Sequence, residues 1–408
     1  MPCERSVWKN GGKKMNLPKI GVVLLLLLMA AMTMVPMVSA VETGDSLDLS
    51  STIEKNYIPE KTAYLTATAA VKEFTQSGAL NNAWNGAQVN PRPDIIYDLN
   101  GKRLFYLFTV ENNENKIGEI KAAASDVIGA SIITIGPVTP PIDKDKVRSR
   151  ATEIISRNGN NAVIKSIDLV CYNYPEIGVM VRYSVNSGTE ETLVLDAYDL
   201  AVVPASHMDS YYQNILPTET KARITRAVSE RNALLVQETT VSPKATVTKT
   251  LSGFPLYPQQ GSAWCAFATA QMISGYYGYS RTQTGIASTM GVNPNNGATI
   301  EQAGSNYYQV STANGGLGKS GSFIRYTGQF TYTDIMNELG SNRPLHTDRY
   351  ESASYHARAI AGYSYTGTSQ YIYIYDPWPV NQGSLYWENW NAFTGQPNPV
   401  HAILYVRN

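Results

Sequence analysis

The stretch Tyr257–Gly278, YPQQGSAWCAFATAQMISGYYG, decides how the rest of this chain is interpreted. It places Gln259 six residues before Cys265, and Cys265 opens a run with helical periodicity that can end at Gly278. The apolar residues on the repeating face of this run are Ala266, Phe267, Ala270, Ile273 and Tyr277. At a helix N-terminus, unpaired backbone N–H groups and the helix dipole favour a thiolate over a thiol. The sequence therefore predicts that Cys265 is a nucleophile.

A nucleophilic thiolate also requires a base, and His356 is the downstream candidate. His356 begins HARAIAGYSY, in which residues alternate with the period of a strand. The next strand-like run, Tyr371–Tyr375, ends at Asp376. If these strands pair antiparallel across a turn at Gly367, the side chains of His356 and Asp376 meet. The carboxylate then fixes the tautomer and orientation of the imidazole, as the third member of a catalytic set does.

Residues in this order resemble a known family of enzymes. Gln259, Cys265, His356 and Asp376, with HARAIAGY and YIYDPW around the last two, are similar to the papain-like cysteine peptidases, most of all to the type that processes bacteriocin leaders and its secreted relatives. The resemblance covers residues 254–408. It implies an α+β peptidase domain in which the nucleophile helix packs on an antiparallel sheet. It also implies that Cys265, His356 and Asp376 form a triad.

The same resemblance assigns the stabilisation of the oxyanion. Gln259 would donate to the oxyanion together with the backbone N–H of Cys265, and Gln260 is the alternative donor one residue further along. The chain departs from the family where Ala266 and Phe267 stand in place of a Gly-Pro pair found in many relatives. This departure leaves the triad intact and concerns the shape of the substrate pocket.

Two other histidines compete for the role of base. His346 stands at the start of a strand with Asp348 nearby, and His401 lies in a C-terminal strand, VHAILYV. Of the three histidines, only His356 has a carboxylate at the spacing that two paired strands would bring together. His356 is therefore favoured as the base.

Residues 1–40 have the pattern of a secretory signal peptide. Basic residues precede the uncharged run IGVVLLLLLMAAMTMVPMVSA from Ile20, which ends in small residues suited to signal peptidase. We therefore expect a secreted, extracellular protein that meets the membrane only through this segment. The alternative is an uncleaved anchor that holds the protein at the cell surface, since the run is nearly long enough to span a bilayer.

Removal of the signal would leave two cysteines, Cys171 and Cys265. A secreted chain with two cysteines often pairs them, but pairing would consume the nucleophile. Cys171 lies in the apolar run Ile167–Cys171. We therefore predict that Cys171 is a buried, inert thiol.

Residues 41–238 are interpreted as an N-terminal domain of two similar units, at 62–137 and 144–204, followed by a helix at 219–236. Each unit has a helical run before a meander of short strands, which is an internal repeat. The region resembles the PepSY-like α+β modules in the propeptides of secreted peptidases. This resemblance implies an intramolecular inhibitor or folding aid. Asp196 and Asp199 are interpreted as solvated turn residues, and His207 as a surface residue.

Residues 239–253, TTVSPKATVTKTLSG after the helix, have the Ser/Thr/Pro composition of an extended linker. A peptidase whose N-terminal domain blocks its own cleft needs a segment that can be cut. The sequence predicts that segment within the linker.

Composition excludes several other classes of protein. The formal net charge is +0, so electrostatics suggest no nucleic-acid partner. The four histidines are scattered, and neither His-Glu-x-x-His nor Cys-x-x-Cys occurs, so no metal site is expected. The spacing of a phosphate-binding loop is also missing, and no cofactor is expected.

The sequence thus predicts a secreted cysteine peptidase that hydrolyses bonds in a peptide or protein substrate and is made as a latent precursor. Two other classes stay open. One is a cell-envelope amide or isopeptide hydrolase with the same triad, which would act on envelope material. The other is a non-catalytic binding module on this fold, for which loss of a triad residue would be the expected sign.

Overall fold

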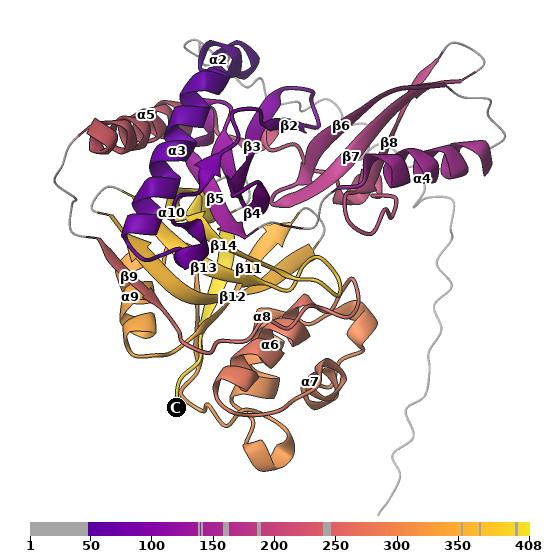
Figure 1. Ribbon diagram of the computed structural model, residues 1–408. Helices are drawn as coiled ribbons and strands as arrows, with labels where there is room; N and C mark the ends of the chain where they lie inside the picture. Colours follow the sequence, from indigo (N-terminus) through magenta and orange to yellow (C-terminus); the bar gives the residue numbers. More distant parts are fainter. Residues whose placement is uncertain are drawn as a thin grey trace, which may run out of the picture. The chain divides into compact units, whose positions relative to one another are not determined.

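The structure is a computed structural model of the chain (Figure 1). It describes residues 48–137, 139, 142–157, 163–185, 189–239, 246–351, 354–366, 369–395 and 399–408. The predicted signal peptide, residues 1–40, lies outside the described residues. Asp48–Asn408 form one compact unit. Among the described residues, no helix has both the length and the apolar character needed to cross a bilayer.

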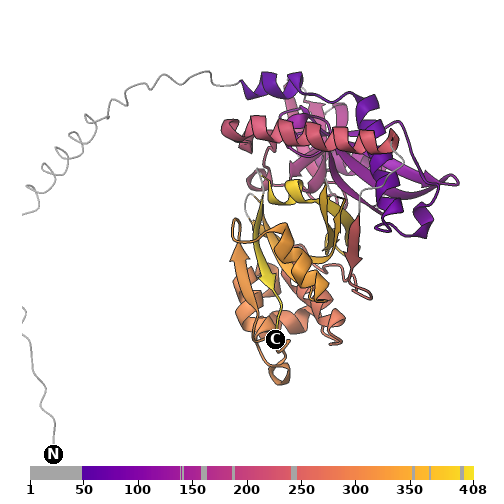
Figure 2. The same ribbon diagram turned by 90° about the vertical axis from the view of Figure 1, so that its left-hand side faces the viewer.

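The N-terminal half, residues 48–239, combines four α-helices with eight strands among its described residues. The helices are α2 (Leu49–Lys55), α3 (Glu60–Gln76), α4 (Lys144–Arg157) and α5 (Pro217–Thr239). The strands are β1 (Gln88–Val89), β2 (Asp94–Asp98), β3 (Arg103–Asn112), β4 (Asn115–Ala123), β5 (Ile132–Pro137), β6 (Val163–Asn173), β7 (Glu176–Ser184) and β8 (Glu190–Asp196). α3 and α5 lie side by side over this half (Figure 2).

The C-terminal half, residues 246–408, begins with a strand and then a group of helices. The helices are α6 (Cys265–Tyr276), α7 (Gln283–Met290), α8 (Ile300–Ala303), a π-helical turn (Gly304–Tyr308), α9 (Tyr332–Gly340) and α10 (Trp390–Thr394). The strands are β9 (Val247–Thr250), β10 (Phe323–Tyr326), β11 (Leu345–Glu351), β12 (Ser354–Tyr365), β13 (Gln370–Asp376), β14 (Ser384–Asn389) and β15 (Val400–Tyr405).

Local sequence explains where several helices begin and end. Thr331 caps α9 through a capping box with Asp334, in which each side chain accepts from the other residue's backbone. Gly278, predicted to end the nucleophile helix, has a φ of +84° just after α6. α3 buries Ala63, Ala67 and Phe74, which recur on one face at helical spacing.

One sheet runs through both halves. Its strand order is β10-β15-β11-β12-β13-β14-β5-β4-β3-β2-β6-β7-β8, with β1 added beside β3 and β9 beside β12. All of these pairs are antiparallel except β2 with β6. This mostly antiparallel sheet with its helices is compatible with the predicted α+β class. The halves join where β5 pairs with β14, at Ile135 opposite Trp387 and Thr134 opposite Glu388.

Side chains of both halves share a hydrophobic core at this junction, which we call the seam. Phe74 of α3 packs edge-on against Tyr371 at 4.7 Å and near Trp387 at 6.0 Å between ring centroids. The Trp387 indole Nε1 donates to the Ala79 carbonyl at 3.1 Å. Tyr371 and Trp387, both from the C-terminal half, are 0% and 1% exposed and belong to the core of the N-terminal half. The seam is therefore part of the protein interior.

The structure differs from the sequence-based boundaries in the predicted linker. Residues 240–245 lie outside the described residues, but Val247–Thr250 form β9, which pairs with Gly362–Tyr365 of β12, and Leu251 is buried. The alternation of valine and threonine suits a strand as well as a linker, and the free edge of β12 decides between them. The two N-terminal units each contain a helix followed by antiparallel strands, and their relation as a repeat stays a prediction.

Candidate active site

Cys265 is the first residue of α6, as predicted. The residue before it, Trp264, provides no side-chain cap, so the N–H groups of the first turn keep their capacity to donate. The Cys265 Sγ lies 3.8 Å from the backbone oxygen of Tyr355, the residue that precedes His356. The helix thus points its positive end, and the thiol, at the start of β12.

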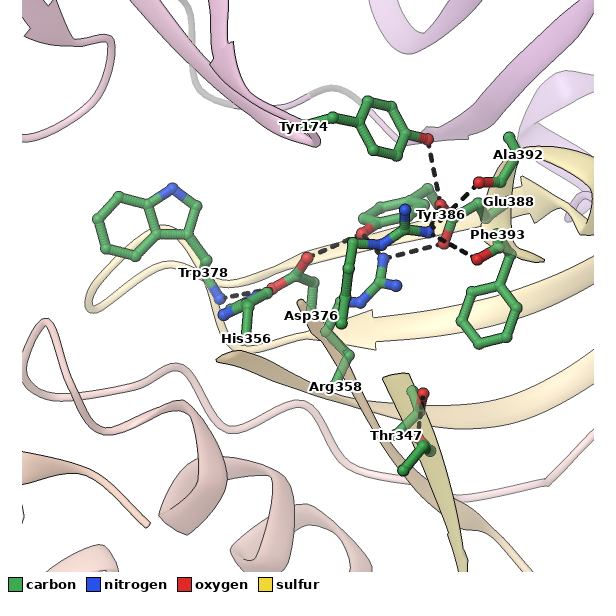
Figure 3. A network of polar contacts seen from close by, with 12 residues as sticks. Tyr174, Thr347, His356, Arg358, Asp376, Trp378, Tyr386, Glu388, Ala392 and Phe393 are labelled. Carbon is green, nitrogen blue, oxygen red and sulfur yellow. Dashed lines mark hydrogen bonds and ion pairs between the residues drawn. The ribbon is translucent and has the colours of Figure 1, made fainter. Parts of the chain in front are cut away.

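His356 and Asp376 meet across the antiparallel pair of β12 and β13. The His356 Nε2 lies 2.7 Å from the Asp376 Oδ1, and the two residues are 7% and 4% exposed. Asp376 also accepts from the Trp378 backbone N–H at 2.9 Å and from the Tyr386 hydroxyl at 2.8 Å (Figure 3). Burial would raise the pKa of Asp376, but the charge of His356 and the hydrogen bonds lower it below its ordinary value. Asp376 is therefore held as a carboxylate.

Gln259 is buried and lies in a loop that ties the nucleophile to the aspartate. Its backbone N–H donates to the Pro377 carbonyl at 3.0 Å, and its carbonyl accepts from the Asn381 N–H at 2.9 Å. Its carboxamide Nε2 donates to the backbone oxygens of Gly261 and Ser262, at 2.9 and 3.0 Å. The amide therefore lies beside Cys265 but uses its hydrogens within the loop.

Behind Asp376, a buried polar network continues to the N-terminal half (Figure 3). Arg358 donates from one nitrogen to the Tyr386 hydroxyl and to Glu388, both at 2.9 Å. Glu388, which is fully buried, also accepts from Arg349 at 3.0 Å and from the hydroxyl of Tyr174 at 3.1 Å. These contacts restrict the position of Tyr386 and so of the Asp376 carboxylate.

Sequence reasoning did not find this network. Arg358 is one of the alternating residues of HARAIAGY. An arginine on the buried face of a strand indicates that a partner is buried with it. Nothing local to Tyr174 marks it as a partner of Glu388, since the two lie 214 residues apart in the chain.

Cys265 and His356 line the same cavity, which we call the cysteine cavity. It has a volume of about 530 Å³, and both halves of the protein contribute to its walls. Gln259 and Trp378 also line it from the C-terminal half. Its residues from the N-terminal half include Tyr172, Glu176, Asp196, Asp199 and His207. The interpretation of Asp196 as solvated is wrong, because it is 4% exposed and accepts from the Tyr172 hydroxyl at 2.8 Å.

Glu176, at the turn between β6 and β7, brings a carboxyl group to the catalytic residues. Burial raises its pKa to about 7, with the charge of His356 opposing the shift and that of Asp196 adding to it. This turn therefore places a titratable group of the N-terminal half beside His356. The turn reaches His356 only through the fold, so no sequence motif could have identified it.

The rival residues lie elsewhere. His346 is fully buried in β11, and burial lowers its pKa to about 3, so it stays neutral beside the Tyr308 hydroxyl. His401 Nδ1 lies 3.4 Å from an oxygen of Asp348, the carboxylate that the sequence had placed near His346. Gln260 is exposed, and its backbone N–H donates to Gln283. Neither rival histidine nor Gln260 is among the described residues that line the cysteine cavity.

The other thiol behaves as predicted. Cys171, in β6, is 1% exposed and unpaired, and burial raises its pKa. Of the two cysteines that the structure describes, Cys265 is therefore the candidate nucleophile.

Comparison with known proteins supports the chemistry of the C-terminal half. Residues 251–398 match the model of the Peptidase_C39 like family, which supports a papain-like cysteine peptidase. The match covers Gln259, Cys265, His356 and Asp376. A search of curated proteins finds no match to the chain.

Proposed function

We propose that this protein is a cysteine peptidase that hydrolyses peptide bonds through Cys265, His356 and Asp376. The observation that carries the proposal is the buried pair of His356 and Asp376, 2.7 Å apart, in the cavity that also holds Cys265 at the start of α6. A nucleophile, a base and an orienting carboxylate are the set that acyl transfer by a thiol needs.

The proposed reaction begins with attack of the Cys265 sulfur on the carbonyl carbon of the substrate. Because Asp376 engages Nε2 of His356, the other ring nitrogen, Nδ1, is assigned to proton exchange with the thiol. His356 then gives this proton to the leaving amine as the C–N bond breaks, and a thioester remains on Cys265. Water adds to the thioester with His356 as the base, and the acid product leaves.

The oxyanion of each tetrahedral intermediate is assigned to the N–H of Cys265 and the carboxamide of Gln259. The N–H of Cys265 belongs to the uncapped first turn of α6, where donors point at a developing negative charge. The carboxamide donates to Gly261 and Ser262 in this structure, so the proposal requires that one of these bonds gives way to the oxyanion.

We further propose that the protein is secreted and that its N-terminal half restrains the enzyme, as the resemblance of this half to PepSY-like modules in the propeptides of secreted peptidases suggests. Support for the restraint comes from the β6–β7 turn, because Glu176 lines the cysteine cavity beside His356. A cut within residues 240–245 would leave the core that the two halves share intact. The seam therefore supports a restraint in which the N-terminal half stays attached after such a cut.

The test compares two cysteine variants in hydrolysis of a peptide mixture, read by mass spectrometry. We expect Cys265→Ala to lose at least about 10³-fold in turnover, since removal of a nucleophile leaves only the contributions of binding and the oxyanion donors. The matched control, Cys171→Ala, should keep turnover because that thiol is buried away from the cavity.

Intact masses from the same samples report whether the chain cuts itself between residues 239 and 253. Envelope cross-linking peptides, included in the mixture, separate the amide-hydrolase alternative from a general peptidase. Equal turnover by the Cys265→Ala protein and the wild type would reject the nucleophile and with it the proposed function.

A further inference from the structure

A second cavity lies on the other side of His356, and we call it the lysine cavity. It has a volume of about 230 Å³. His356 and Asp376 line one part of it, and Glu176, His356 and Trp378 line both this cavity and the cysteine cavity. These three side chains therefore stand between the two cavities.

The floor of the lysine cavity is one face of the N-terminal sheet. Two rows of paired residues cross β3, β4 and β5, and every member lines the cavity: Leu107, Lys121 and Thr134 form one row, and Thr109, Glu119 and Gly136 form the other. The turn of the β6–β7 hairpin and the segment from Trp378 to Tyr386 complete the walls. Strands and turns of both halves thus build the cavity.

Lys121 is the unusual member of this lining. It is 8% exposed in the middle of the sheet, yet its ammonium group has no hydrogen bond or ion pair with any residue that the structure describes. The Lys121 Nζ lies over the ring of Phe105, 5.5 Å from the ring centroid. Burial lowers the pKa of Lys121, which expresses the cost of holding a charge in this place without an acceptor.

The carboxylates around the cavity are engaged elsewhere. Glu119 accepts from Lys116 at 2.8 Å and from the hydroxyl of Thr139 at 2.6 Å. Asp94 lies 3.6 Å from Lys144. Asp376 accepts from His356, Trp378 and Tyr386, as described above. Glu176 forms no ion pair with Lys121, and its charge interacts with that of His356. An anion inside the cavity would therefore meet a cation that the protein leaves available.

The remaining walls indicate which anion fits. Apolar side chains surround the space, among them Leu107, Leu169, Ile177 and Leu385. The volume is below the range of pockets for drug-sized ligands, so the cavity suits a group of about the size of one amino-acid residue. An apolar group that ends in a carboxylate matches both the walls and Lys121.

We propose that the lysine cavity binds the C-terminal residue of the peptide substrate, with an apolar side chain against the walls and the α-carboxylate on Lys121. The inference rests on the proposed function: the amine leaves from the side of His356 that faces Cys265, and the segment beyond it reaches the lysine cavity past Glu176 and Trp378, which line both cavities. The C–N bond breaks, the new amine takes its proton from His356, and the departing segment keeps its free carboxylate at Lys121. Glu176 has to move aside for a chain that occupies both cavities.

A binding experiment tests the site without any turnover. N-acetyl-L-leucine and N-acetyl-L-leucinamide are titrated calorimetrically into full-length Cys265→Ala protein, where both ligands have the same side chain and only one has a carboxylate. We expect the acid to bind at least about 10-fold more tightly than the amide, as for a charge-assisted contact in a poorly solvated site. Equal affinities would overturn the proposal with no further variant.

Two lysine variants locate the effect. Lys121→Met, on the Cys265→Ala background, should remove the preference for the acid, whereas Lys116→Met should keep it. Lys116 lines the same cavity but is exposed and paired with Glu119, so it is a matched control. A preference for the acid that survives Lys121→Met would overturn the assignment. Hexanoate that binds as tightly as N-acetyl-L-leucine would overturn the peptide as the ligand.

Hydrolysis then separates this inference from the proposed function. Peptides with free and amidated C-termini are offered to the wild type, and we expect about 10-fold higher kcat/KM for the free acids, with the preference lost in Lys121→Met. Cleavage of both forms at equal rates would reject the lysine site and leave the peptidase standing. No cleavage of any peptide, with acid binding that depends on Lys121, would reject the peptidase and leave the binding site standing.

Discussion

The N-terminal half touches the C-terminal half in two places of opposite character. At the seam, Phe74, Tyr371 and Trp387 pack without exposure, and β5 pairs with β14. At the cleft contact, which is the β6–β7 turn with Glu176, cavities lie on both sides of the contact. Close packing resists displacement, whereas a contact between cavities has room to move. The two contacts show how the N-terminal half can stay attached at the seam while its contact with the candidate active site changes.

Each contact contains a glutamate from the N-terminal half, and burial raises the pKa of both Glu230 and Glu176 to about 7. Their partners differ. Glu230 at the seam accepts from the Ser131 N–H at 2.9 Å, the Asn389 amide at 2.6 Å and the Tyr371 hydroxyl at 3.2 Å. Glu176 has the charge of His356 as its main stabilising influence. Hydrogen-bond geometry fixes the first glutamate, whereas the second is stabilised by the charge of His356, which changes in the proposed reaction.

The largest expected effect tests the seam. Trp387→Ala removes a side chain that is 1% exposed and that stacks on Tyr373 at 4.7 Å between ring centroids. We expect a loss of about 3–5 kcal/mol in the free energy of unfolding, since the cavity cannot fill from either rigid half. Urea unfolding followed by hydrogen exchange should show the amides of α3 and β13 losing protection together.

The control for this variant is Tyr350→Ala, because Tyr350 is 46% exposed and its removal should cost little. If Trp387→Ala lowers the hydrogen-exchange protection of the C-terminal half alone, the two halves are separately stable. The seam would then not be a core that both halves share.

A second expected effect concerns pH and stability at the seam. The folded pKa of Glu230, about 7, lies above its ordinary value of 4.5, so the folded protein holds a proton that the unfolded chain releases between these values. This stabilisation is complete below pH 4.5 and is lost as the pH rises through 7, by about 3 kcal/mol. Glu230→Gln should remove that part of the pH dependence, measured as the change in urea midpoint between pH 5 and pH 8.

Other carboxyl groups also contribute to the pH dependence, Glu176 in the same direction and Asp376 in the opposite one, but they are present in both proteins and cancel in the comparison. The exposed Glu190→Gln serves as the control and should leave the slope unchanged. A wild type and a Glu230→Gln protein with the same slope would show that Glu230 does not release a proton on unfolding.

Features whose signals lie close together in the sequence could be predicted, and features that depend on distant parts of the chain could not. Cys265 at a helix start and the meeting of His356 with Asp376 depend on local periodicity and on one strand pair, and the structure contains both. β9 was mistaken for a linker because its partner, the edge of β12, lies more than 100 residues further along the chain.

The contacts between the halves could not be predicted in this way. Glu176 reaches His356, and Tyr174 reaches Glu388, only after two separately ordered hairpins are placed against each other. Lys121 looks from the sequence like an ordinary exposed residue of an alternating strand. The elements of both halves that cover this face of the sheet make it a buried cation.

The smallest expected effect tests the cleft contact. Because the pKa of Glu176 is about 7, its carboxyl is ionised above that pH and protonated below it. The ionised group attracts the protonated His356 and holds the turn over the cavity, so Glu176→Gln should raise kcat/KM where the wild type is charged. A contact of this kind contributes up to about 1 kcal/mol, which corresponds to a rise of up to about 5-fold. The ratio of variant to wild type should be close to one at pH 5.5 and should grow towards pH 8, measured with one peptide substrate. A ratio that is the same at every pH would show that the charge of Glu176 does not restrain the enzyme, and the cleft contact would then differ from the seam in packing alone.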